Sequence, residues 1–166
     1  MRVLIITREN REDRHYGLGK SIGRVAEGLR QRGHNVAYRT QVDYPRAHAI
    51  WQPRLAPFLR VFGDAATAIN ERLVQGAVAA RDAISFNASH VWAQDPWLVI
   101  GLYLGLWHQL RIGRRPFRLI VSEHGLGSFA QAARLDGLSF DLNGLRRLIL
   151  LEQHIVRRAD CVFIPS

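Results

Sequence analysis

Two glycines and a lysine near the amino terminus have the types and spacing to bind an anion. Gly17, Gly19 and Lys20 stand between a predicted strand and an apolar stripe with helical spacing. Glycines at such a turn let backbone N–H groups approach a phosphate at the positive end of the helix, where Lys20 would add a charge. The same glycines can also simply permit a tight turn, and Lys20 can be solvated, so both interpretations stay open.

Asp95 and His124 each follow a predicted buried strand. The His124 imidazole, beside Glu123 and Gly125, could donate to a phosphate or a sugar hydroxyl, or it could be a structural histidine. Asp95 could bind substrate, but it precedes Pro96, so its carboxylate is better placed to cap the next helix.

Several other sites are excluded by spacing. A phosphate-binding loop needs a glycine five residues before Gly19, where the chain has Arg14. A dinucleotide fingerprint fails at Ile22, its third glycine position, and no acidic residue ends the second predicted strand. No Ser/His/Asp arrangement can be assembled, and Cys161 falls in a strand that we expect to be buried, which argues against a cysteine nucleophile.

Strands and helices alternate along most of the chain. The hydrophobic patterns predict strands over 2–7, 35–40, 89–94, 117–122 and 160–164, and helices over 22–32, 65–84, 97–110 and 142–158, with a glycine loop at 17–21 before the first helix. This alternation predicts an α/β fold, a Rossmann-like doubly wound parallel sheet with helices on both faces. In such sheets ligands bind at the carboxyl ends of the strands, where 8–20, 95–96 and 123–128 should converge.

The segment 41–64 has no regular pattern. It contains Pro45, Pro53 and Pro57 among many apolar residues, so we expect it to be functional, partly helical or mobile. Arg54 and Arg60 flank apolar residues, as in segments that lie on anionic membranes, although packing within a protein is the simpler alternative and the prolines limit helix length.

Composition and charge exclude several further classes of protein. The 166 residues suit one domain, and 23 basic against 14 acidic residues give a net charge of +9. The basic residues are dispersed, which argues against a nucleic-acid reader. A single cysteine and the lack of a signal-peptide pattern predict a cytoplasmic protein, and the apolar run 97–107 is too short to span a membrane.

Four segments, in order along the chain, resemble the amino-terminal half of family 4 glycosyltransferases. The residues Gly17-Leu18-Gly19, continuing to Gly33-His34-Asn35-Val36, are similar to that family's glycine pair, helix and Gly-His-x-Val turn, with Tyr16 in place of the first glycine. Residues 90–96 resemble its strand-Asp/Glu-Pro element, residues 117–125 its Val-Thr-x-His-Gly, and residues 157–166 its Arg-Arg-Ala-Asp-x-Val-Ile-x-x-Ser.

The resemblance implies half of a metal-independent GT-B enzyme that takes a sugar from a nucleotide donor without a cofactor. Residues 1–166 would be its acceptor-side domain, and the donor-binding domain is expected to be absent, so this chain alone should not turn over. The implied partners are the missing donor domain and a sugar or lipid-linked acceptor, and the segment 51–62 adds an anionic membrane surface as a candidate contact. His124 would contact the transferred sugar, and the substrate-binding residues would be Gly17, Gly19, Lys20, Asp95, Glu123 and Gly125.

A second hypothesis remains open beside it. The chain could be a nucleotide- or dinucleotide-binding Rossmann module that works with a separate protein. Tight binding of a dinucleotide would favour this alternative.

Overall fold

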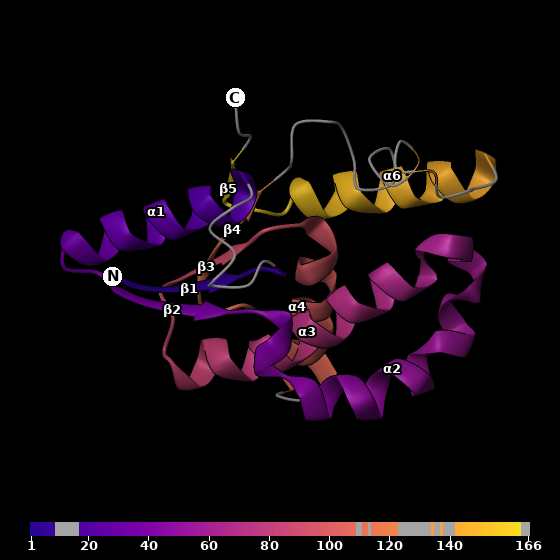
Figure 1. Cartoon of the computed structure of the whole chain (residues 1–166), viewed down its shortest axis with the longest axis horizontal. Helices are drawn as coiled ribbons and strands as arrows, with labels where there is room; N and C mark the ends of the chain where they lie inside the picture. The colour runs from indigo at the N-terminus through magenta and orange to yellow at the C-terminus, as the bar shows by residue number, and fades with distance from the viewer. Residues whose placement is uncertain are drawn as a thin grey trace.

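Five short strands of mostly aliphatic residues form one parallel sheet (Figure 1). The computed structural model describes residues 1–8, 17–108, 111–112, 114–122, 134, 137 and 142–163. In sheet order β2-β1-β3-β4-β5, the strands are Asn35–Arg39, Arg2–Ile6, His90–Ala93, Arg118–Ser122 and Cys161–Phe163, and every neighbouring pair is parallel. The predicted α/β, Rossmann-like architecture is confirmed.

Helices cover both faces of this sheet. Helix α1 packs on one face, and α3, α4 and the end of α6 pack on the other. The helices of the described part are α1 (Gly17–Gln31), α2 (Pro45–Leu59), α3 (Ala66–Ser85), α4 (Pro96–His108) and α6 (Leu142–Val156), with short 3₁₀ helices η1 (Gln41–Asp43) and η2 (Arg60–Ala65) on either side of α2.

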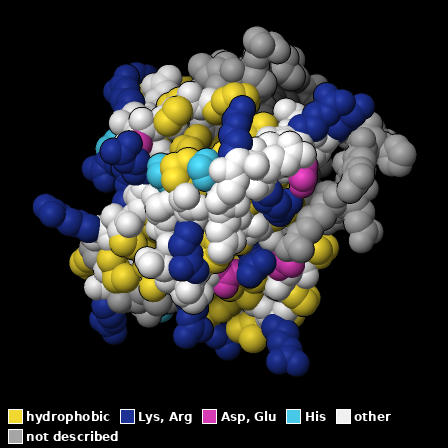
Figure 2. Space-filling model, turned by 90° about the vertical axis from the view of Figure 1, so that its left-hand side faces the viewer, with side chains coloured by type: hydrophobic (Ala, Val, Ile, Leu, Met, Phe, Trp, Pro, Cys, Tyr) yellow, Lys and Arg dark blue, Asp and Glu magenta, His cyan; other side chains and the backbone are white. Residues whose placement is uncertain are grey.

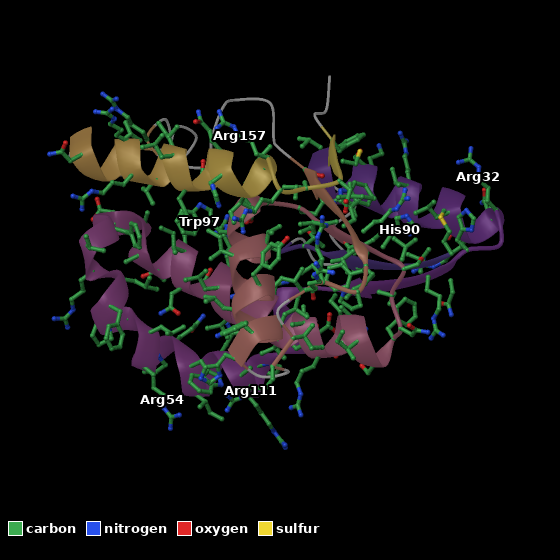
Figure 3. All side chains as sticks on the ribbon, turned by 180° about the vertical axis from the view of Figure 1, so that it is seen from behind. Arg32, Arg54, His90, Trp97, Arg111 and Arg157 are labelled. Carbon is green, nitrogen blue, oxygen red and sulfur yellow. The ribbon has the colours of Figure 1, made fainter. Side chains whose placement is uncertain are left out.

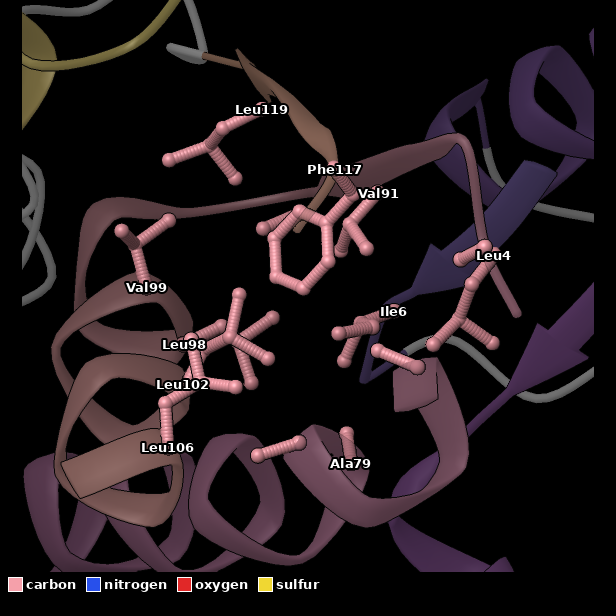
Figure 4. Packing of buried hydrophobic residues seen from close by; sticks show 14 of the residues in the cluster. Leu4, Ile6, Ala79, Val91, Leu98, Val99, Leu102, Leu106, Phe117 and Leu119 are labelled. Atoms are coloured by element: carbon pink, nitrogen blue, oxygen red, sulfur yellow. The ribbon is translucent and has the colours of Figure 1, made fainter. Parts of the chain in front are cut away.

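Alternation along β1 sends successive side chains into two separate cores. Val3 and Ile5 contact the α1 side, whereas Leu4 and Ile6 pack against α3 and α4 (Figure 4). Because β1 is buried on both faces, its sequence is a continuous aliphatic run and shows no polar alternation.

A third core lies beyond the carboxyl ends of the strands. It joins α2, η2, α3, α4 and α6 through Leu59, Ala65, Ile69, Leu73, Trp97 and Leu148. In Figure 1 the helices α2, α3 and α6 accordingly extend past the sheet on the side where the strands end.

Helices α3 and α4 approach each other closely because glycines face the partner helix. A Cβ at Gly76 would collide with Leu98 O, one at Gly101 with Leu73 O, and one at Gly105 with Ala77 O. Only glycine fits at these positions, since each collision would be with backbone.

Of the alternatives left open for 41–64, the structure shows the helical one. Most of this segment is helix α2, with Pro45 in its first turn and Pro53 and Pro57 inside it. The two internal prolines do not end the helix, and the tertiary contacts of Leu59 and the buried His48 hold its inner side against the domain.

The expectation for Cys161 was wrong. Cys161 does lie in a strand, but its side chain is exposed, because β5 pairs only with β4 at the edge of the sheet in the described part of the chain. The start of β5 is held by Asp160, whose Oδ2 accepts from Leu119 N and from Arg115, both at 2.6 Å. These contacts, the backbone N–H first, lower the pKa of Asp160.

Candidate ligand-binding edge of the sheet

Buried polar side chains gather where the strands end. Buried polar groups need hydrogen-bond partners, so these side chains are expected to form a hydrogen-bond network at this edge. The strand ends contribute Thr7, Thr40, Gln94, Asp95 and Ser122, and the surrounding helices contribute His48, Asn70, Gln75 and Glu152.

Helix α3 supplies most of the contacts to this edge. Gln75, which is fully buried, donates from Nε2 to Thr7 O at 2.7 Å, just past the end of β1. One turn earlier, Glu71 accepts from Arg8 at 2.7 Å. Helix α3 therefore fixes the path of the chain as it leaves β1.

Arg72, the residue after Glu71 in α3, contacts the end of β3. Arg72 Nε donates to Asp95 Oδ2 at 2.7 Å, with only 12% of each side chain exposed. The strands β1 and β3 are adjacent, and strand order reverses between them, because the chain first adds β2 on one side and then β3 on the other. The contacts of Glu71, Arg72 and Gln75 thus lie at the topological switch point, where open α/β sheets bind ligands.

Both oxygens of the Asp95 carboxylate are engaged in this structure. Oδ2 accepts from Arg72, and Oδ1 accepts from Leu98 N at 2.9 Å, in the first turn of α4. The helix-capping role expected from Asp95-Pro96 is confirmed. A substrate contact by Asp95 stays a prediction, and it would have to displace or share one of these bonds.

Tryptophan side chains fasten two further elements to the same end of the molecule. Trp97 Nε1 donates to Glu152 Oε1 at 2.7 Å and so ties α4 to α6 (Figure 3). Trp92 Nε1 donates to Ser122 Oγ at 2.7 Å, across β3 and β4. Ser122, the last residue of β4, is buried and held in place by this bond.

His48 is a functional candidate that the sequence analysis did not single out. Its side chain is buried, and its Nδ1 lies 2.9 Å from Gln52 Nε2. Its Nε2 is buried and has no hydrogen-bond partner among the described residues. Burial lowers the pKa of His48, with a smaller opposing effect from Glu71 and a lowering effect from Arg8. The lowered pKa favours the neutral imidazole of His48, which keeps one ring nitrogen without a described partner near the chain that follows β1.

The glycines of the anion-binding prediction lie inside α1 rather than in a loop before it. Gly17 is the first residue of α1, and Gly19 and Lys20 complete its first turn. The N–H groups of a first turn have no partner within the helix, so this end can still attract an anion.

A groove of about 810 Å³ runs between α1 and the edge strand β2. The α1 residues along it include Gly19, Lys20, Arg24 and Arg30, so its cations outnumber its one acid, Glu27. Asp95 does not line this groove. The structure thus brings Gly19 and Lys20 together but places Asp95 in a different set of contacts.

The remaining predicted site residues, Glu123, His124 and Gly125, lie outside the described residues. They begin directly after Ser122, at the carboxyl end of β4. Within the described ranges, no group of three or more His, Cys, Asp or Glu side chains could hold a metal ion.

Comparison with family models, with curated proteins and with solved structures found no match for this chain.

Proposed function

We propose that this chain is the acceptor-side domain of a glycosyltransferase that takes a sugar from a nucleotide donor. The observation that carries the proposal is the position of the four family-like segments on the sheet. Gly17 starts the helix after β1, Asp95-Pro96 joins β3 to α4, Ser122 ends β4 just before Glu123, and Asp160 leads into β5.

The physical chemistry of the first turn of α1 supports the same function. A departing nucleoside diphosphate accumulates negative charge, which free backbone N–H groups and a helix amino terminus stabilise without a metal. Gly17 and Gly19 allow the phosphate a close approach, and Lys20 adds a positive charge beside them. His124 would contact the transferred sugar, and a second domain would hold most of the donor.

Calorimetric titration of the 166-residue chain tests the proposal. The probes are UDP, GDP, NAD and NADP, each added to the wild type, to Lys20→Ala and to Arg32→Ala. Arg32 is the matched control, because it is an exposed cation just after the other end of α1 (Figure 3).

We expect a nucleoside diphosphate to bind and Lys20→Ala to weaken it about fivefold, the worth of one charge-assisted contact, while Arg32→Ala leaves it unchanged. Tight NAD or NADP binding in place of diphosphate binding would favour a dinucleotide module. Diphosphate affinity that Arg32→Ala reduces as much as Lys20→Ala would contradict a site at the start of α1.

A further inference from the structure

The outward side of α2 and η2 is apolar where a surface helix is ordinarily polar. Four large hydrophobic side chains are exposed there, namely Ile50 (50%), Trp51 (42%), Phe58 (78%) and Val61 (67%). Pro53 and Pro57 are exposed beside them. By contrast, His48 and Leu59 are the buried residues of α2, so the helix has an inner side and a separate outer side.

The charges on α2 itself are all positive, and the exposed acid Asp64 lies in η2. Arg46, Arg54 and Arg60 are exposed, and α2 contains no acidic residue. The Arg54 guanidinium lies 5.3 Å from the centre of the Trp51 ring, so the cation and the aromatic side chain share one patch. We call this set of residues on 46–61 the α2 patch.

The α2 patch lies at one margin of the molecule. In Figure 1, α2 runs along the lower edge, outside α3. Figure 3 places Arg54 at the same lower margin as Arg111, which follows α4. Trp107, near the end of α4, is 69% exposed, which adds another aromatic side chain at the end of the helix that points to this margin.

Two other groups of arginines also have apolar neighbours: the Arg2 guanidinium lies 4.9 Å from the centre of the Phe86 ring, and Arg146 and Arg147 share α6 with the exposed Leu150. The α2 patch differs from them in carrying four exposed large hydrophobic side chains, two of them aromatic. Figure 2 shows many Lys and Arg side chains standing out separately from the face that carries the amino ends of the strands. An anionic lipid bilayer offers hydrocarbon and anions side by side, so it can satisfy apolar side chains and arginines together. A second copy of this chain does not, because two α2 patches would bring arginines against arginines.

We infer that the α2 patch binds the surface of an anionic lipid bilayer. Helix α2 would lie in the plane of the interface, with Trp51, Phe58 and Val61 among the upper acyl chains and Arg46 and Arg54 at the phosphates. No helix among the described residues is long and apolar enough to cross a bilayer. This inference is independent of the proposed sugar transfer.

Vesicle co-sedimentation of the full 166-residue chain tests the inference. The vesicles are phosphatidylcholine alone and phosphatidylcholine mixed with phosphatidylglycerol, each at low and high salt. The variants are Arg46→Glu/Arg54→Glu and Phe58→Ser. Arg146→Glu/Arg147→Glu and Leu150→Ser on α6 are matched controls, because they make the same charge reversal and a similar loss of an apolar side chain at exposed positions on the opposite edge of the molecule.

We expect binding to the anionic vesicles at low salt, weaker binding at high salt, and little binding to phosphatidylcholine. The double arginine variant should reduce the partition coefficient about tenfold or more. Phe58→Ser should reduce it about fivefold, and the α6 variants should change it less than about twofold. Circular dichroism confirms that each variant is folded, which the exposure of these side chains favours.

Three results would overturn the inference. They are an absence of binding to anionic vesicles at low salt, equal losses in the α2 and α6 variants, and a dimer in sedimentation that Phe58→Ser dissociates. The second would show that net charge alone drives association, and the third would assign the patch to self-association.

Discussion

Asp95 performs two structural tasks with one carboxylate, since it caps α4 and pairs with Arg72. Asp95→Ala should therefore lower the free energy of unfolding by about 3 kcal/mol, because it removes a cap and leaves Arg72 without this partner in a mostly buried position. Asp95→Asn should cost less, since asparagine also caps helices. Urea denaturation measures both.

Glu27→Ala is the control for Asp95. Glu27 is an exposed acid with a side chain 59% accessible, so its loss should change the free energy of unfolding by less than about 0.5 kcal/mol. An Asp95→Ala variant as stable as Glu27→Ala would show that the contacts at the switch point contribute nothing.

His48 makes the stability depend on pH. Because its pKa is lower in the folded chain than in the unfolded chain, the unfolded chain takes up a proton first as the pH falls. The stabilisation is present in full above about pH 6.5 and is lost as the pH falls from there through the lowered pKa. His48→Asn keeps an acceptor for Gln52 and should flatten this dependence, as measured by urea denaturation from neutral to mildly acidic pH.

The control for this measurement is His154→Asn, which replaces an exposed histidine on α6. It should keep the pH dependence of the wild type. Identical pH profiles for His48→Asn and the wild type would mean that His48 is not the group responsible.

Single residues could be predicted from the sequence where a local rule applies. The capping role of Asp95 followed from the Asp-Pro pair. Gly19 was expected in a loop before the helix, whereas it lies in the first turn of α1. His48 could not be identified, because its burial depends on how α2 packs on the domain, and no local pattern carries that information.

At the scale of elements, the crossing of α3 and α4 depends on glycine. Gly105→Ala should lower the free energy of unfolding by about 1–3 kcal/mol, because its Cβ would meet the backbone of Ala77. Gly28→Ala is the matched control in α1, where nothing lies within 4 Å of the added Cβ. This control should raise stability by about 0.5–1 kcal/mol through helix propensity. A Gly105→Ala variant as stable as Gly28→Ala would contradict the close crossing.

The elements with strong periodicity were predictable, and those governed by tertiary contacts were not. Strand β1 and helix α3 appear within one residue of the expected bounds, since an aliphatic run and an alanine-rich stripe have few alternatives. For helix α2 only a partly helical segment could be predicted, without bounds, because Pro53 and Pro57 argue locally against a helix that packing against α3 and η2 nevertheless stabilises. The exposure of Cys161 was missed because sequence does not show which strand forms the edge.

At the scale of the whole molecule, positive charge is distributed over a fold that concentrates its buried polar groups at one edge. The net charge of +9 attracts anions in general, whereas the first turn of α1 and the switch point between β1 and β3 are the places where we propose that they bind. The net charge could be predicted from composition. The separation of Asp95 from the groove beside Lys20 could not be predicted, because it depends on the three-dimensional arrangement of α1 and α3.

Amide hydrogen exchange followed by mass spectrometry, with and without a saturating nucleoside diphosphate, tests the central claim most directly. We predict slower exchange in peptides that cover Gly17 to Gly23 and the chain just after β1, with no change in peptides of α6. Protection confined to α6 or to the α2 patch, with the start of α1 exchanging as in the free chain, would contradict an anion site at this edge of the sheet.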